Sequence, residues 1–171
     1  MGTRQVSFSR ELWIDGADFM EEPPKKYFRL FPGNEVRLKG AYFITCTDFV
    51  KNEDGSIREI HCTYDPKTRS GSGFEGRKVK GTIHFVDAAT AVPVTVRQYD
   101  YLFKDDGEGS MVKNPDSVRV STVYAESSVK DAAAGERFQF FRHGYFVADT
   151  RDSKPGEPVF NEIVGLKSSW K

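Results

Sequence analysis

In this 171-residue chain, apolar side chains recur at alternating positions far more often than at helical spacing, and this pattern is the strongest constraint on its fold. Residues 42–50 and 57–64 are rich in β-branched and aromatic side chains, and Asn52-Glu53-Asp54-Gly55 lies between them. Two alternating runs joined by turn residues predict a β-hairpin. By the same criterion we expect further strands at 36–38, 78–86, 94–103, 118–124, 138–141, 145–148 and 159–164.

Helical signals are weak by comparison. Asp18-Phe19-Met20-Glu21 predicts a short turn with Asp18 as its N-cap, and Pro23-Pro24 ends that turn. Single turns also fit residues 88–91 and 128–134. The aromatic content of 13% suits the thin core of a barrel or sandwich, which large side chains fill. We therefore expect an all-β protein, with short helical turns and a domain boundary in the small-residue segment near 87–93.

Charge and cysteine usage exclude several classes of protein. Lys and Arg total 25 and Asp and Glu total 25, so a polybasic wrapper of nucleic acid and a polybasic membrane anchor are disfavoured. Apolar runs fall short of the roughly 20 residues that a spanning helix needs, so no membrane partner is expected. Cys46 and Cys62 lack a CxxC spacing, which favours reduced structural thiols in a cytoplasmic protein.

Motifs for catalysis are weak. Gly71-Ser72-Gly73-Phe74-Glu75-Gly76 matches a GxGxxG pattern, but a turn precedes it and a predicted strand follows, so we interpret it as a loop without a dinucleotide. His61, His84 and His143 are far apart and have no acidic or cysteine neighbour at metal-ligand spacing, so no metal site is expected. No pairing of a nucleophile with a base stands out, and we predict no catalytic residue.

Residues 25–39 carry the most informative pattern. This segment holds five cations, three aromatic rings and one acid, directly after Pro23-Pro24. Cations interleaved with aromatic rings suit splayed single-stranded bases, because guanidinium groups donate to base edges and rings stack on base faces. From composition alone, a solvated basic edge strand is the alternative.

A second cluster spans residues 138–146. Alternation places Gln139 and Phe141 on one face of a strand, and Arg142-His143-Gly144 forms a tight turn. A glutamine on the solvent face and an arginine at a hairpin tip are able to reach a base. An ordinary aromatic hairpin is the alternative.

These clusters and the stretches around them resemble the C-terminal anticodon-binding domain of the glutaminyl-tRNA synthetase family. The resemblance implies two β-barrels of the type found in a ribosomal protein that binds 5S rRNA. A distal barrel would occupy residues 1–88, and a proximal barrel, lacking a strand from upstream, would occupy 89–171. The matching stretches cover essentially the whole chain in order: 11–15, 17–19, 35–38, 62–65, 76–86, 91–94, 99–103, 114–117, 138–140, 144–146, 158–161 and 164–166.

The same resemblance implies that this chain recognises tRNA and that a separate domain carries out catalysis. The chain contains neither the HIGH-like nor the KMSKS-like motif of a class I synthetase, so catalysis, ATP and Mg²⁺ would belong to a parent catalytic domain in cis. This chain would need no cofactor of its own. Its expected partner is the anticodon loop of glutamine tRNA, bound by a monomer. The different-class alternative is a free-standing β-barrel module that binds RNA or protein, and a small hydrolase is disfavoured.

Individual roles follow from the family's matching positions. Arg37 would recognise the first anticodon base, a pyrimidine, Arg29 the third base, a guanine, and Gln139 with Arg142 the central uracil. Arginine and glutamine carry the paired donors and acceptors that such base edges require. Relatives have Gln, Lys and Glu where this chain has Lys26, Phe28 and Phe141, so two charged neighbours become rings. Rings would stack on bases or contact the loop at Tyr27, Phe28 and Phe141. Lysine side chains would contact phosphates at Lys25, Lys26 and Lys39.

Overall fold

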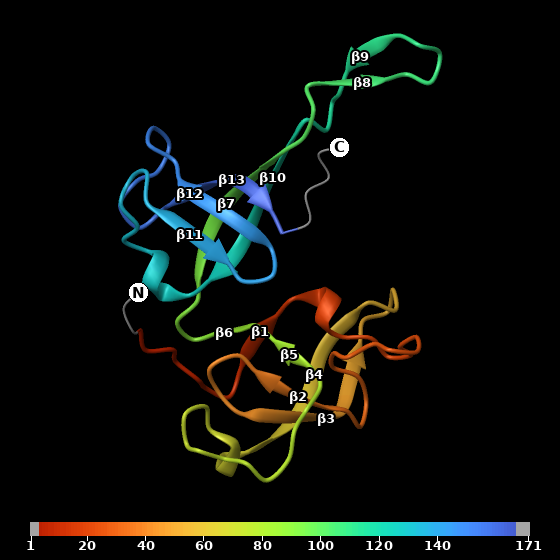
Figure 1. The fold of residues 1–171 in the computed structure, drawn as a ribbon, viewed down its shortest axis with the longest axis vertical. Coiled ribbons are helices and arrows are strands. Elements are labelled where there is room, and N and C mark those ends of the chain that lie inside the picture. The colour runs from red at the N-terminus through yellow and green to blue at the C-terminus, as the bar shows by residue number, and fades with distance from the viewer. Residues whose placement is uncertain (1–3, 167–171) are drawn as a thin grey trace. The chain divides into compact units, whose positions relative to one another are not determined.

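The computed structural model describes residues 4–166, which form two compact units, Met1–Ala89 and Thr90–Lys171 (Figure 1). Strands dominate both units, and the described helical segments are 3₁₀ turns of three residues. The prediction of an all-β protein is therefore confirmed. None of the helices in the described part has the length and apolar character needed to cross a bilayer.

Unit 1 is built on a four-stranded sheet with the strand order β4-β3-β2-β5. The expected hairpin is the antiparallel pair β3–β4, and Gly55 adopts a φ of 82° in its turn, a region that favours glycine. β5 lies parallel to β2, and β1 forms a separate antiparallel pair with β6. The strands are β1 (Leu12–Ile14), β2 (Glu35–Leu38), β3 (Phe43–Lys51), β4 (Ile57–Asp65), β5 (Thr82–Ile83) and β6 (Phe85–Asp87).

The core of unit 1 explains which side chains of β2 face outward. Val36 and Leu38 are fully buried among Leu30, Ile44, Ile83 and other apolar side chains. Burying one such side chain stabilises the fold by about 1.5–3 kcal/mol. Because successive residues of a strand point to opposite faces, this burial directs Arg37 to the outer face of the sheet.

Two local expectations for unit 1 are wrong. The N-cap of the first turn, η1 (Gly16–Asp18), is Asp15, whose carboxylate accepts a 2.8 Å hydrogen bond from the Ala17 amide, while Asp18 is buried at the turn's end. The expected strand 78–86 is divided into β5 and β6, and residues 77–81 are irregular. A Cβ at Gly81 would lie 2.2 Å from the carbonyl oxygen of Phe28, so the backbone of this stretch lies against the segment that carries Phe28 and leaves no room for a side chain at Gly81.

Unit 2 contains a five-stranded sheet with the order β10-β7-β13-β12-β11, in which β13 runs parallel to β7. Its core comprises Val94, Val96, Val129, Phe146, Ala148 and Phe160. A short turn, η3 (Ser127–Val129), overlaps the start of the segment 128–134, where a turn was expected. The strands of this sheet are β7 (Val92–Tyr99), β10 (Val118–Ala125), β11 (Arg137–Phe140), β12 (Gly144–Ala148) and β13 (Val159–Gly165).

A small hairpin extends from the β7 and β10 ends of unit 2, away from β11–β13 (Figure 1). It pairs β8 (Phe103–Asp105) with β9 (Met111–Lys113), and the acidic loop at 106–110 is its turn. The expected strand 94–103 thus ends at Tyr99 and resumes at Phe103. The exposed apolar side chains of this arm are Tyr101, Leu102, Phe103, Met111 and Val112.

Candidate nucleic-acid interface

Arg37 lies at the edge of an open, basic hollow on unit 1. Its backbone N–H donates to the Gly81 carbonyl oxygen at 2.9 Å, so β2 holds the residue next to the segment that precedes β5. The hollow has a volume of about 690 Å³, and within residues 4–166 its lining contains three cations, two hydroxyl groups and no carboxylate. Such a lining favours an anionic or acceptor-rich ligand. The lining residues are Arg37, Lys39, Gly40, Ser70, Lys78, Val79 and Thr82.

A row of residues runs across the outer face of the four-stranded sheet. Thr82 pairs with Arg37, Arg37 with Phe43, and Phe43 with Asp65. The Arg37 guanidinium carbon lies 4.7 Å from the centroid of the Phe43 ring, within the range of a cation–π contact. Although Phe43 points outward, it is only 1% exposed.

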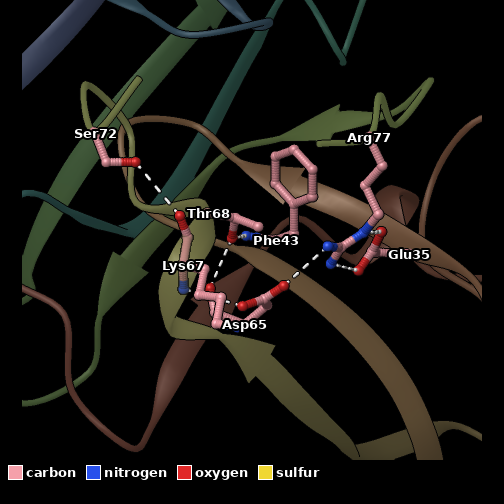
Figure 2. Close-up of polar contacts among 7 residues, drawn as sticks. All are labelled: Glu35, Phe43, Asp65, Lys67, Thr68, Ser72 and Arg77. Atoms are coloured by element: carbon pink, nitrogen blue, oxygen red, sulfur yellow. Dashed lines mark hydrogen bonds and ion pairs between the residues drawn. The ribbon is translucent and has the colours of Figure 1, made fainter. Parts of the chain in front are cut away.

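Arg77 covers this ring and is fixed by two carboxylates (Figure 2). Its Nε donates to Glu35 Oε2 at 2.8 Å, its Nη2 pairs with Glu35 Oε1, and its Nη1 lies 2.9 Å from Asp65 Oδ2. These contacts raise the pKa of Arg77 above its usual value. The pKa of Asp65 is lowered chiefly by the hydrogen bond from the Lys67 amide and next by the hydrogen bond from the Arg77 guanidinium. Arg77 is therefore committed within the fold, whereas Arg37 lines the hollow.

Arg29 has a different environment from Arg37. Its Nη1 donates to the Ala17 carbonyl oxygen at 2.9 Å and lies 3.0 Å from the carboxylate of Asp18. The Asp18 side chain is 1% exposed and that of Arg29 is 38% exposed. Tyr27 donates its hydroxyl to the same Ala17 oxygen at 3.1 Å. Both predicted site residues thus attach to the η1 turn, and Arg29 neutralises a buried acid.

Phe28 is the exposed ring of the basic segment, with half of its surface accessible. The Lys80 ammonium lies 5.5 Å from its ring centroid. The backbone carbonyl oxygen of Phe28 lies against Gly81. The carbonyl oxygen of Gly81 in turn accepts a hydrogen bond from the backbone N–H of Arg37. The segments containing Phe28, Gly81 and Arg37 are therefore side by side in unit 1.

Lys26 and Arg142 share an unusual backbone conformation. Within residues 4–166 they are the non-glycine residues with positive φ, at 70° and 69° respectively. A left-handed conformation costs a non-glycine residue about 1–2 kcal/mol. Both belong to the set predicted to contact RNA. Backbone strain of this kind clusters at functional sites, which supports a role for these two positions.

The second predicted cluster lies on the β11–β12 hairpin of unit 2. Gln139 is exposed on β11 and pairs with Tyr145 of β12, which is 45% exposed. Phe141, Arg142 and His143 form the turn, closed by a hydrogen bond from the His143 amide to the Phe140 carbonyl oxygen. The hairpin thus presents Gln139 to solvent, as alternation predicts, with half-buried Phe141 and Arg142 at its tip.

The remaining predicted residues, Lys25 and Lys39, are exposed on unit 1, and Lys39 shares the hollow with Arg37. Sequence reasoning missed Lys78 and Lys80 as candidates, because it treated residues 78–86 as one regular strand. Their signal was present in the sequence, because Arg77-Lys78-Val79-Lys80 holds three cations in four residues. Within the described part of the chain, no cluster of three or more metal-binding side chains occurs.

Known protein families and curated proteins contain matches to this chain. Two family models match, both described as the anticodon-binding domain of class I tRNA synthetases (E and Q), one over residues 1–65 and the other over 82–149. Glutamine–tRNA ligase of Clostridium perfringens is 54% identical over 176 residues, covering 99% of this chain and 32% of the relative.

Two further relatives carry the same name. The Clostridioides difficile protein is 54% identical over 177 residues, covering 99% of this chain and 32% of its own length. The Cupriavidus necator protein is 53% identical over 177 residues, covering 99% of this chain and 30% of its own length. The chain therefore spans about a third of the length of the curated relatives that it matches.

Proposed function

The chain belongs to the anticodon-binding domain family of class I glutamine and glutamate tRNA synthetases, and from this premise we propose that it binds the anticodon loop of glutamine tRNA. It would supply the tRNA recognition that a glutamine–tRNA ligase needs for aminoacylation. The catalytic domain of that ligase, acting in cis with ATP and Mg²⁺ in the cytoplasm, would carry out the chemistry. The two units would be the distal barrel, 1–88, and the proximal barrel, 89–171, of a monomer.

The observation that carries this proposal is the hollow at Arg37. An outward guanidinium beside Lys39 and Lys78, with no carboxylate in the described lining, offers paired donors to a base edge and cations to the adjoining phosphate. A cytosine presents acceptors on its pairing edge, so Arg37 suits a first anticodon base that is a pyrimidine. Each good bidentate contact with a base contributes about 1–3 kcal/mol of discrimination.

Arg29 would recognise the third base, a guanine. Within the described residues both of its contacts with the η1 turn use Nη1, so Nη2 is available to donate to the acceptor edge of guanine. The pair with Asp18 would hold the guanidinium in place before RNA arrives. Tyr27 and Phe28, on the same segment, would contribute ring contacts to the loop.

The central uracil would be contacted from unit 2. Gln139 both donates and accepts, which matches the alternating groups on the pairing edge of uracil. Arg142 and Phe141, at the tip of the same hairpin, would add a cation and a stacking surface. The exposed lysines, Lys25, Lys26 and Lys39, would neutralise phosphates of the loop.

The experiment is a titration of the 171-residue chain with anticodon stem-loop RNAs at about 50 mM and about 200 mM salt. One RNA carries the anticodon loop of glutamine tRNA, and a control carries the same stem with a scrambled anticodon. We expect tighter binding of the matched loop at both salt concentrations. Equal affinity for both loops would overturn the proposal in favour of a free-standing module that binds RNA or protein without reading anticodons.

A further inference from the structure

Anticodon recognition leaves one group of side chains on unit 1 without an assigned role, the ion-pair cluster of Arg77, Glu35 and Asp65 (Figure 2). Arg77 engages both oxygens of Glu35 and reaches Asp65 with its remaining terminal nitrogen. One guanidinium therefore pairs with two carboxylates, those of Glu35 and Asp65. Figure 2 shows the Arg77 head group between the two carboxylates.

Arg37 is the neighbour that this arrangement affects. Glu35 and Arg37 are two residues apart on β2, so their side chains leave the strand on the same face. Both guanidinium carbons lie near the Phe43 ring, at 4.7 Å for Arg37 and 5.4 Å for Arg77. If Arg77 were removed, the Glu35 carboxylate would be able to pair with Arg37, the cation on the same face of β2.

We propose that Arg77 is a positioning residue for Arg37. By binding Glu35 in a bidentate manner it prevents that carboxylate from capturing Arg37, and so it keeps the Arg37 guanidinium turned toward the basic hollow. Phe43 supports both head groups, with Phe74 packed against its edge. The inference rests on the proposed function, because it gives Arg77 a purpose only if Arg37 recognises a ligand.

The turn beneath this cluster has anchors that do not involve Arg77. Thr68 Oγ1 accepts from the Phe43 amide at 2.8 Å and donates to the Asp65 carbonyl oxygen at 2.7 Å. The Asp65 carboxylate also accepts from the Lys67 amide at 3.0 Å. The η2 turn (Pro66–Thr68) therefore retains its attachment to the sheet when Arg77 is replaced, and Arg77→Ala is expected to fold.

The test compares the wild-type chain with Arg77→Ala, Glu35→Gln and the double variant, each titrated with stem-loops that differ only at the first or the third anticodon base. We expect Arg77→Ala to lose about tenfold in first-base discrimination and to keep its third-base discrimination. Glu35→Gln alone should discriminate as the wild type does. The double variant should regain first-base discrimination, because a neutral amide no longer captures Arg37.

Rescue by Glu35→Gln separates positioning from a merely structural role, since loss of folding would weaken recognition of both bases and would not be restored by a second substitution. Wild-type discrimination in Arg77→Ala would overturn the inference and leave the proposed function intact. So would a loss in Arg77→Ala that the double variant fails to restore. A wild-type chain that ignores the first base would overturn the proposed function together with the inference.

Discussion

Arg29→Ala should destabilise unit 1 as well as weaken RNA binding, because the arginine neutralises a buried acid. The substitution removes a cation 3.0 Å from Asp18 and a donor 2.9 Å from the Ala17 carbonyl oxygen. Exposed ion pairs contribute at most about 1 kcal/mol, and breaking a buried pair costs about 3–5 kcal/mol. Since Asp18 is 1% exposed and Arg29 is 38% exposed, we expect a cost of about 2 kcal/mol.

The assay is urea unfolding followed by the backbone amide signals of β2–β5. With a urea m-value of about 1 kcal/mol/M for a unit of this size, the midpoint should fall by about 2 M. Asp18→Asn in the Arg29→Ala background should recover part of the loss, because it removes the buried negative charge with which Arg29 pairs. Arg29→Lys should keep most of the stability and still bind guanine poorly, because an ammonium lacks the planar pair of donors. An unchanged midpoint in Arg29→Ala would refute the reasoning.

Three further perturbations follow from the geometry. Lys26→Gly relieves a φ of 70° and should raise the free energy of unfolding of unit 1, measured with urea, by up to about 1 kcal/mol while weakening stem-loop binding. A lower free energy of unfolding would show that the conformation of Lys26 is not strained. Gly81→Ala places a Cβ at 2.2 Å from the Phe28 carbonyl oxygen and should lower the thermal midpoint of unit 1, in contrast to Gly16→Ala, which meets no atom within 4 Å. The pKa of Asp149 is lowered from 3.8 to about 2 by hydrogen bonds from the backbone amides of Asp152 and Arg151, by the Asn161 side chain and by the charge of Arg97. The ionised Asp149 carboxylate therefore stabilises unit 2 above pH 4, and this stabilisation is lost as the pH falls toward 2. Between pH 4 and pH 2 the free energy of unfolding of unit 2, measured with urea, should fall by at most about 2 kcal/mol. In Asp149→Asn this pH dependence should be weaker. An equally steep fall in the variant would show that other groups cause it.

Alternation in the sequence was sufficient to predict the β3–β4 hairpin and the solvent-facing position of Gln139 on β11. It failed where tertiary contacts decide the outcome. Asp18 has the sequence context of a local N-cap, but its carboxylate instead pairs with Arg29, eleven residues further along the chain, which no local pattern encodes.

The burial of Phe43 was equally inaccessible from sequence. Phe43 shares the outer face with Arg37, and the loop carrying Phe74 and Arg77 covers its ring. That loop has no periodicity, and its GxGxxG spacing gives no hint of the sheet beneath it. The same irregularity concealed Lys78, which reaches the hollow only because residues 77–81 leave the strand geometry.

The central claim is that separate side chains recognise separate bases of one anticodon. The most direct measurement is a matrix of stem-loop affinities in which Arg37→Ala, Arg29→Lys and Gln139→Ala are each titrated with loops changed singly at the first, third and central base. We expect each variant to lose discrimination by about 5- to 150-fold at the base that its side chain recognises, and to keep discrimination at the other two bases. Variants that weaken all loops by the same factor would contradict it.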